Sequence, residues 1–306
     1  MILSKNRIVT FQKKIFEWWS THKRDLPWRH TRDPYRIMVS EVMLQQTQVL
    51  RVVAKYREFI QTFPTVVDLA QASPAQVLRI WKGMGYNRRA LYLHKAAKII
   101  VENVWPVIPA HAGIQSKIVK TFDLNNFPKS EKELRKLQGL GTYTARAILV
   151  FAYEQEVPLV DTNIRQIITN FFFTKQAKGP ALMGLKGRAL EKEIEDIARQ
   201  LIPPGKSWAW HQALMDYGAL ALPVLTRSPV HPSPRKGLPF RDSNRFYRGR
   251  IIDRLRDGEI SEKKLVSELV ITYTKPAAFI HSIIDSLTKD GLLQRTSRGV
   301  LRFPVK

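Results

Sequence analysis

Two helical patterns meet at a glycine turn near the middle of the chain, and this junction strongly constrains the fold. Leu134 and Leu137 lie one helical turn apart before Gly139-Leu140-Gly141. A second apolar series follows the turn and comprises Ala145, Ile148, Leu149 and Ala152. Such a turn directs backbone N–H groups outward at a helix start, and glycine lets a bulky phosphate approach. Taken alone the pattern favours an ordinary helical corner, but Asp161 and the rest of the chain change that balance.

The charge balance points to a polyanionic partner. The 306 residues include 50 Lys and Arg against 26 Asp and Glu, a formal net charge of +24. Such an excess concentrates a polyanion near the surface, so nucleic acid is the leading candidate. A membrane surface is the second candidate, although no apolar run is long enough to span a bilayer. A hydrophobic content of 44% indicates a folded protein with one large or two modest domains.

The chain contains no cysteine. Disulfides, thiolate metal sites and iron–sulfur clusters are therefore excluded, and no cofactor is expected. The first 14 residues have too little apolar character for a secretory signal. A cytoplasmic, nucleoid-associated location is the resulting expectation.

Helical periodicity dominates most of the chain. Amphipathic or apolar helices are expected over 7–20, 66–82, 88–103, 163–172, 187–202 and 208–222. A further helix is expected to open at Glu41, with Ser40 as its N-cap, and to continue to Val49. A carboxylate in a first turn is favoured by the helix dipole, so Glu41 also has a purely structural interpretation. Leu26-Pro27-Trp28-Arg29 is expected to form an extended turn, because proline restricts the preceding residue.

Two segments between these helices suit contact with nucleic acid. The neighbouring polar side chains of Gln45, Gln46 and Thr47 favour hydrogen bonding to bases or backbone over core packing. The segment Gly83-Met84-Gly85-Tyr86-Asn87 offers an apolar tip and an aromatic ring, which fits a wedge into stacked bases. Considered alone, it is more typical of a plain loop. His211 is expected to be a surface histidine, because no second ligand is spaced for a metal.

The C-terminal part of the chain has a different organisation. Residues 104–128 are expected to be a surface insertion, 175–186 a basic loop, and 223–242 a proline-rich basic linker. Helices are expected over 244–256, after Ser261 and from Pro276, followed by a hairpin over 291–303. Three helices and a hairpin are typical of a winged-helix DNA-binding module, with a protein-docking module as the alternative.

Five motifs of this chain occur in an order that is found in one family. They are Leu26-Pro27-Trp28-Arg29, the run SEVMLQQTQV over 40–49, Gly83-Met84-Gly85-Tyr86, Leu137-x-Gly139-Leu140-Gly141-x-Tyr143-Thr144-Ala145 and Val160-Asp161-Thr162-Asn163. Together they resemble the MutY-type adenine DNA glycosylases, which belong to the helix-hairpin-helix glycosylases. The resemblance covers roughly residues 7–222. SEVMLQQTQV is specific to the MutY branch, whereas the hairpin and the following aspartate mark the wider superfamily.

The resemblance implies a mainly α protein with a two-lobed helix-hairpin-helix glycosylase domain over 1–222. A small winged-helix-like domain over 243–306 would follow it. The target base would be flipped out of duplex DNA into the enzyme. Glu41 corresponds to the general acid that protonates N7 of adenine. Asp161 corresponds to the carboxylate that stabilises the oxocarbenium-like sugar, while Tyr143 and Asn163 match positions that support this pair.

The resemblance also implies residues that contact the DNA. Trp28, Arg29, Leu44 and Gln212 match the adenine pocket. Gln46 and Met84 match positions that insert into the duplex, Thr47 matches a contact to the opposite purine, and Gln45 and Tyr86 are further substrate-binding candidates. Gly139, Gly141 and Thr144 match the hairpin that grips the DNA backbone, which is also a candidate site for a monovalent or divalent cation.

The residue at position 143 and two departures from the family qualify the predicted activity. Bifunctional relatives hold a lysine where this chain has Tyr143, so base excision without efficient strand cleavage is expected. The iron–sulfur cysteines and the Nudix-like C-terminal domain of most members are not found here. The prediction is a monofunctional enzyme, acting as a monomer on double-stranded DNA, that excises adenine opposite 8-oxoguanine or guanine. The alternatives are a thymine or uracil glycosylase at G mismatches and a non-catalytic DNA-binding protein.

Overall fold

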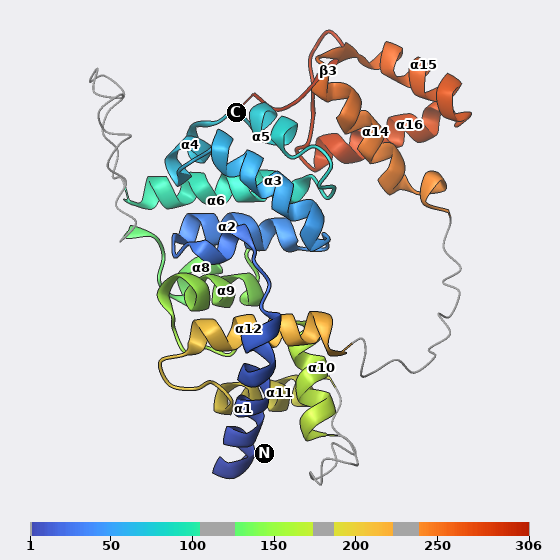
Figure 1. The fold of residues 1–306 in the computed structure, drawn as a ribbon. Coiled ribbons are helices and arrows are strands. Elements are labelled where there is room, and N and C mark those ends of the chain that lie inside the picture. The colour runs from blue at the N-terminus through green and yellow to red at the C-terminus, as the bar shows by residue number, and fades with distance from the viewer. Residues whose placement is uncertain (1, 105–125, 174–186, 223–238, 306) are drawn as a thin grey trace. The chain divides into compact units, whose positions relative to one another are not determined.

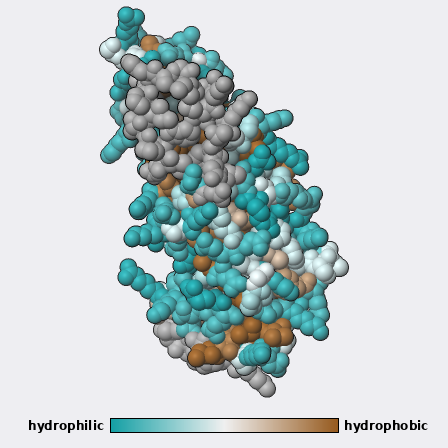
Figure 2. Space-filling view, turned by 90° about the vertical axis from the view of Figure 1, so that its left-hand side faces the viewer, coloured by the Kyte–Doolittle hydropathy of each residue, from teal (hydrophilic) through white to brown (hydrophobic). Residues whose placement is uncertain are grey.

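The computed structural model describes residues 2–104, 126–173, 187–222 and 239–305 (Figure 1). The expected basic loop, almost all of the expected insertion and most of the expected linker lie outside these residues. The described part of the chain is mainly helical, as the periodicity predicted. No described helix combines the length and the apolar character that a bilayer-spanning segment needs. Hydrophilic residues cover much of the face shown in Figure 2.

The chain folds into two compact units, and each is assembled from separate stretches of sequence. Unit 1 comprises Met1–Glu41, Phe127–Lys136 and Leu140–His231. Unit 2 comprises Val42–Asn126, Leu137–Gly139 and Pro232–Lys306. The boundary cuts through one helix, α2 (Pro34–Leu44), and through the glycine turn.

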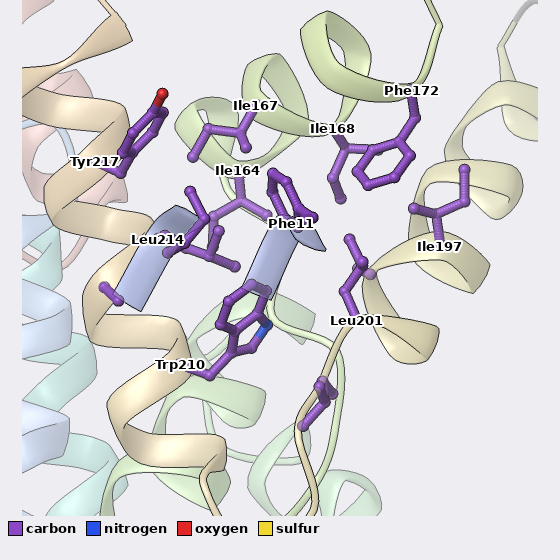
Figure 3. Packing of buried hydrophobic residues seen from close by; sticks show 14 of the residues in the cluster. Phe11, Ile164, Ile167, Ile168, Phe172, Ile197, Leu201, Trp210, Leu214 and Tyr217 are labelled. Carbon is purple, nitrogen blue, oxygen red and sulfur yellow. The ribbon is translucent and has the colours of Figure 1, made fainter. Parts of the chain in front are cut away.

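Unit 1 is built around a cluster of buried aromatic and branched side chains. Its helices are α1 (Lys5–His22), η1 (Pro27–His30), α8 (Glu131–Leu134), α9 (Thr142–Tyr153), α10 (Thr162–Phe172), α11 (Arg188–Gln200) and α12 (Ser207–Leu220). Figure 3 shows Phe11 of α1 beside Phe172 and Trp210. Its ring meets that of Phe172 edge-on at 5.1 Å and that of Trp210 at 5.8 Å. This cluster fixes α10 and α12, the helices that carry Asn163 and Gln212, against α1.

Unit 2 combines helices of the middle of the chain with the whole C-terminal segment. The first group is α3 (Val49–Thr62), α4 (Val66–Gln71), α5 (Pro74–Ile80) and α6 (Arg88–Val104). The second group is η5 (Phe240–Asp242), α14 (Asn244–Arg256), α15 (Glu262–Tyr273) and α16 (Ala277–Lys289). The two groups meet at α5 and α14, where Arg256 Nε donates to the carbonyl of Leu78 at 3.1 Å.

The C-terminal segment contains the expected helices and hairpin and one strand that was not expected. The antiparallel strands β1 (Ile260–Ser261), β2 (Gln294–Arg295) and β3 (Val300–Arg302) form a sheet in the order β1-β3-β2. Ser261 caps α15 by accepting the N–H of Lys264, as predicted. The unexpected strand β1 has only two residues, too few to give an alternating pattern.

The expected start of the helix that carries Glu41 was wrong. The helix α2 begins at Pro34, after Asp33, whose carboxylate accepts the N–H of Tyr35 at 2.8 Å. Ser40 lies inside this helix and its hydroxyl donates to the carbonyl of Ile37. Glu41 is therefore in the last turn, where the helix dipole disfavours a carboxylate instead of favouring it. The helix also ends at Leu44 instead of continuing to Val49.

Two other local expectations were also wrong. The expected helix over 66–82 is divided into α4 and α5, because Ser73 forms a capping box with Gln76 and Pro74 occupies the first turn of α5. Pro27 begins the short 3₁₀ helix η1, not an extended turn. Leu26 before it remains extended, at φ −128° and ψ 135°, as the rule for residues before proline requires.

Candidate active site

Unit 1 brings together two carboxyl groups that are far apart in the sequence. Glu41 lies in the last turn of α2 with 6% of its surface exposed, and Asp161 is the N-cap of α10. Burial raises the pKa of Glu41 to about 8, and the negative charge of Asp161 adds to the rise. The Glu41 carboxyl therefore keeps its proton at neutral pH and can act as an acid.

Asp161 receives backbone hydrogen bonds that stabilise the anionic form of its carboxyl group. One carboxylate oxygen accepts the N–H of Ile164 at 2.7 Å, at the positive end of the α10 dipole. Burial raises the pKa of Asp161, but hydrogen bonds from the backbone N–H groups of Ile164 and Asn163 oppose that rise. The pair is thus asymmetric: backbone hydrogen bonds stabilise the Asp161 carboxylate, whereas burial and the charge of Asp161 both favour the protonated form of Glu41.

Tyr143 completes this group from the first turn of α9. Burial raises its pKa well above the usual value, and the charges of Glu41 and Asp161 raise it further. Its phenol is therefore neutral over the whole physiological range. A neutral phenol can donate a hydrogen bond, but it carries no amine that could form a Schiff base with a sugar.

The predicted base pocket residues Trp28 and Arg29 lie in η1, and both are at least nine-tenths buried. The two terminal nitrogens of Arg29 each donate to Asp216 at 2.8 Å. Asp216 also accepts from Arg24 Nε at 2.5 Å and from Trp19 Nε1 at 2.9 Å. Sequence reasoning did not assign a role to Arg24 or Asp216, because 192 residues separate them and no local pattern connects them.

Two helical positions of α12 add to this arrangement. Gln212 is 4% exposed and lies one helical turn before Asp216, so both side chains leave the same face. Gly218 lies against the start of α10, where an added Cβ would be 2.6 Å from Cβ of Asn163. Gly218 thereby permits the close approach that places Asn163, and its role was also missed.

The expectation that His211 lies on the surface was wrong. It is 2% exposed, Nδ1 lies 2.8 Å from the Ser207 carbonyl, and Nε2 accepts the N–H of Leu159 at 3.3 Å. Burial lowers its pKa to about 4, so the ring is neutral. His211 therefore joins α12 to the segment before Asp161. The sequence could not predict this contact, because Leu159 contributes only its backbone N–H, which every residue except proline also has.

The remaining predicted DNA-contacting residues fall mostly in unit 2, where Arg89 organises them. Arg89 is buried, with 8% of its surface exposed. Its guanidinium forms six hydrogen bonds of 2.5–3.2 Å, and the acceptors are the hydroxyl of Thr47 and the carbonyls of Val42, Met43, Gln45, Met84 and Gly85. These bonds fix the chain that follows Leu44 and the Gly83–Tyr86 segment in one arrangement. After Leu44, Gln46 adopts φ 53° and its side chain is exposed.

The glycine turn also has a specific reason for its composition. Gly139 adopts φ 89°, and an added Cβ would lie 2.8 Å from Cβ of Tyr92. Its carbonyl accepts from Gln45 Nε2 at 3.4 Å. Gly141 is the exposed N-cap of α9. Thr144 was expected at the DNA backbone but is 3% exposed, because α9 turns that face into the core.

The expected apolar tip of the 83–87 segment requires a correction. Met84 is 3% exposed, and its carbonyl is held by Arg89 at 3.0 Å. Tyr86 is instead the exposed side chain, at 41%, with a backbone φ of 45°. The residue available for contact with a base at this tip is therefore aromatic, not aliphatic.

An iron–sulfur cluster of the kind that the resemblance implies does not fit this chain. All 306 residues lack cysteine, so the thiolate ligands are missing. Among the described residues, no three His, Asp or Glu side chains come together in a group that could hold a metal ion. The cation considered for the hairpin stays a prediction.

Comparison of the sequence with known proteins identifies the family to which the chain is similar. Residues 39–204 match the family described as HhH-GPD superfamily base excision DNA repair protein. The adenine DNA glycosylase of Mycobacterium tuberculosis is 31% identical over 95% of this chain and 92% of its own length.

Solved structures agree with this assignment. The structure of a thermostable thymine-DNA glycosylase matches with a TM-score of 0.55 and 26% identity, over 70% of this chain and 87% of that one. A non-covalent endonuclease III–DNA complex matches in fold, with a TM-score of 0.53 and 16% identity, over 72% of this chain and 87% of that one. The chain belongs to the HhH-GPD superfamily of base excision DNA repair proteins.

Proposed function

We propose that this protein is a monofunctional DNA glycosylase that removes adenine mispaired with 8-oxoguanine or guanine. The observation that carries the proposal is the buried Glu41 carboxyl, whose pKa is raised to about 8 beside Asp161, the residue that caps α10. Similarity to an adenine DNA glycosylase along 95% of the chain supports the choice of adenine. The substrate is double-stranded DNA, and the net charge of +24 suits that polyanion.

The chemistry follows from the asymmetry of the two carboxyl groups. Glu41 donates its proton to N7 of adenine, and the electron pair of the glycosidic bond leaves with the neutral base. The positive charge that develops on the sugar is stabilised by the Asp161 carboxylate. Water then adds to C1′ and releases a proton, which leaves an abasic site. Because Tyr143 stands where a lysine would be needed, the strand itself is not cut.

A thymine glycosylase acting at T:G mismatches is the second candidate. It is supported by the match to the thermostable thymine-DNA glycosylase at 26% identity. The adenine proposal is preferred, because the similarity to the adenine enzyme is higher and extends over more of the chain. A non-catalytic DNA-binding protein has no need for a protonated, buried glutamate at this place.

One assay separates these functions. Duplexes with A:8-oxoG, A:G, T:G or U:G are incubated with the protein, and abasic sites are then revealed with alkali. Release from the two adenine duplexes is expected, with strand breaks only after alkali. Glu41→Gln and Asp161→Asn should each abolish release and retain duplex binding. Release from T:G alone would assign the second candidate, and no release from any duplex would remove the enzymatic proposal.

A further inference from the structure

The proposed chemistry does not use a cavity of unit 2 that has a volume of about 910 Å³. The Gly83–Arg89 segment, Gln45 and Gln46 form one wall, and η5 and α14 of the C-terminal segment form the other. Ligand cavities in proteins are typically about 300–1,000 Å³. The cavity is therefore large enough for a ligand the size of a nucleotide, and two parts of the chain are needed to form it.

The lining is strongly basic. Seven of the described lining residues are arginines, and Asp253 is the acidic one. Several of these arginines are already held: Arg250 and Arg256 pair with Asp253, and Arg248 pairs with Asp290. Among the described residues, the exposed side chains of Arg51 and Arg245 have no ion-pair partner. Two guanidinium groups thus remain available for an anion.

Exposed aromatic rings stand beside the free guanidinium of Arg245. Its central carbon lies 4.3 Å from the ring centre of Tyr86 and 5.9 Å from that of Phe240. Tyr86 is 41% exposed and Phe240 is 62% exposed, which is unusual for large aromatic side chains. Because the guanidinium groups of Arg245 and Arg89 both lie over the Tyr86 ring, the more exposed Phe240 ring is the one that offers a stacking surface to a flat, electron-rich ligand. Nucleotide bases are recognised by such surfaces, with phosphates held by arginine.

We propose that this cavity binds an unpaired nucleotide of the DNA substrate. Its base stacks on Phe240, and its phosphate is held by Arg245 and Arg51. An acidic peptide would use the arginines but would leave the aromatic faces unoccupied, so a nucleotide fits better. The proposal rests on the proposed function only for the statement that the ligand belongs to DNA. It also gives the C-terminal segment a role, because α14 and η5 supply one wall of the cavity.

Binding of a short fluorescein-labelled thymidine oligonucleotide to the full chain, followed by anisotropy, tests the proposal. Arg245→Met and Phe240→Ala should each weaken binding by roughly five- to 100-fold, the range for loss of a stacking contact. The matched control is Arg254→Met, which removes the same charge from the same helix. Arg254 pairs with Glu268 and does not line the cavity, so its loss should change affinity by less than about twofold.

A second pair of variants separates charge from volume. Gly249 lines the cavity from α14, and an added Cβ there meets no atom within 4 Å. Gly249→Glu and Gly249→Gln introduce side chains of nearly equal size, and only the first adds a negative charge. Glu should therefore weaken oligonucleotide binding more than Gln, by about tenfold at low salt. Thermal melting of each variant checks that the fold is retained.

Three results would overturn the proposal. Arg245→Met and Phe240→Ala could bind like the unaltered chain, or Arg254→Met could weaken binding to the same extent. In the third result, an acidic peptide displaces the oligonucleotide with equal affinity, and the same substitutions abolish peptide binding. That result would assign a protein partner instead. Adenine release from the mismatched duplex is measured with the unaltered chain in parallel. Failure of that release rejects the proposed function. The oligonucleotide-binding measurements test nucleotide binding in the cavity, whatever the result of the release assay.

Discussion

Asp216 and Arg29 form a buried, doubly hydrogen-bonded ion pair across 187 residues of sequence, with two N–O distances of 2.8 Å. The carboxylate is fully buried, and the Arg29 side chain is 6% exposed. Burial alone would raise the pKa of Asp216, but the hydrogen bonds and charges of Arg29 and Arg24 lower it. The pair holds η1, which carries Trp28, against α12, which carries Gln212, and so links the two halves of the expected base pocket.

Replacement of Asp216 by Asn should destabilise the protein by about 3 kcal/mol, because it leaves a buried guanidinium without its counter-charge. Urea unfolding measures this loss. The matched control is Glu154→Gln, which removes a carboxylate from the half-exposed pair with Arg32. Its effect should remain below about 1 kcal/mol. Equal effects of the two substitutions would show that the Asp216 pair has no special structural role.

The rate of adenine release should fall as the pH rises through about 8. Burial and then the charge of Asp161 raise the pKa of Glu41 to that value, and only the protonated carboxyl can donate to the base. Single-turnover rates between pH 6 and pH 10 give this profile. A rate that stays constant across this range would exclude Glu41 as the group that delivers the proton.

Glu41→Gln should stabilise the folded protein at high pH but not at low pH. Between its ordinary pKa of 4.5 and the folded value of about 8, Glu41 holds a proton in the folded state and has lost it in the unfolded state. The unfolded state therefore binds fewer protons, and stability falls as the pH rises through this window. Glutamine removes this penalty, so the variant should gain about 3–5 kcal/mol at pH 9 and little at pH 4.

Urea unfolding at the two pH values measures this gain. Glu17→Gln is a suitable control, because Glu17 is an exposed partner of Lys13. Its stability difference from the unaltered chain should not depend on pH in this range. A constant difference for Glu41→Gln as well would mean that the buried carboxyl does not titrate as its surroundings require.

Local chemistry explains which parts of the fold could be predicted from the sequence. The helices α10 and α14 agree closely with their expected ranges because their apolar residues recur at helical spacing, and Ser261 caps α15 as a serine commonly does. The same rule failed at Ser40, where a serine–glutamate pair imitates a helix start. There the true start at Pro34 depends on the side chain of Asp33.

Long-range relationships could not be predicted for a different reason. Glu41 and Asp161 were identified by resemblance, but their burial and unequal proton affinity depend on packing that no local pattern encodes. Arg89 binds five backbone carbonyls, which are the same for every residue type and therefore leave no sequence signal. Asp216 and Gly218 were missed because their partners lie on other helices.

Replacement of Arg89 by Met should loosen both the Gln45–Thr47 turn and the Gly83–Tyr86 segment. The substitution removes the Arg89 donors from five carbonyls, although those of Gly85 and Gln45 still accept from Trp81 Nε1 and Thr47 Oγ1, and buried acceptors that lose a partner are costly. A loss of about 2–4 kcal/mol in stability is expected, together with faster amide hydrogen exchange in both segments. Arg88→Met is the control, since Arg88 is half exposed and reaches Asp290 only at 3.4 Å. Unchanged exchange in Arg89→Met would contradict the organising role.

Gly218→Ala should slow adenine release although Gly218 carries no functional group. The new Cβ would lie 2.6 Å from Cβ of Asn163, so α10 must shift, and its N-cap Asp161 shifts with it. Overpacking of this kind costs about 1–3 kcal/mol, and a displaced carboxylate stabilises the sugar cation less well. Single-turnover release and urea unfolding measure the two effects.

Gly249→Ala is the matched control, because Gly249 lies inside a helix and has open space around the position of an added Cβ. That variant should be as stable as the unaltered chain or more stable by about 0.5–1 kcal/mol. If Gly218→Ala behaves in the same way, the contact between α12 and α10 does not position Asp161.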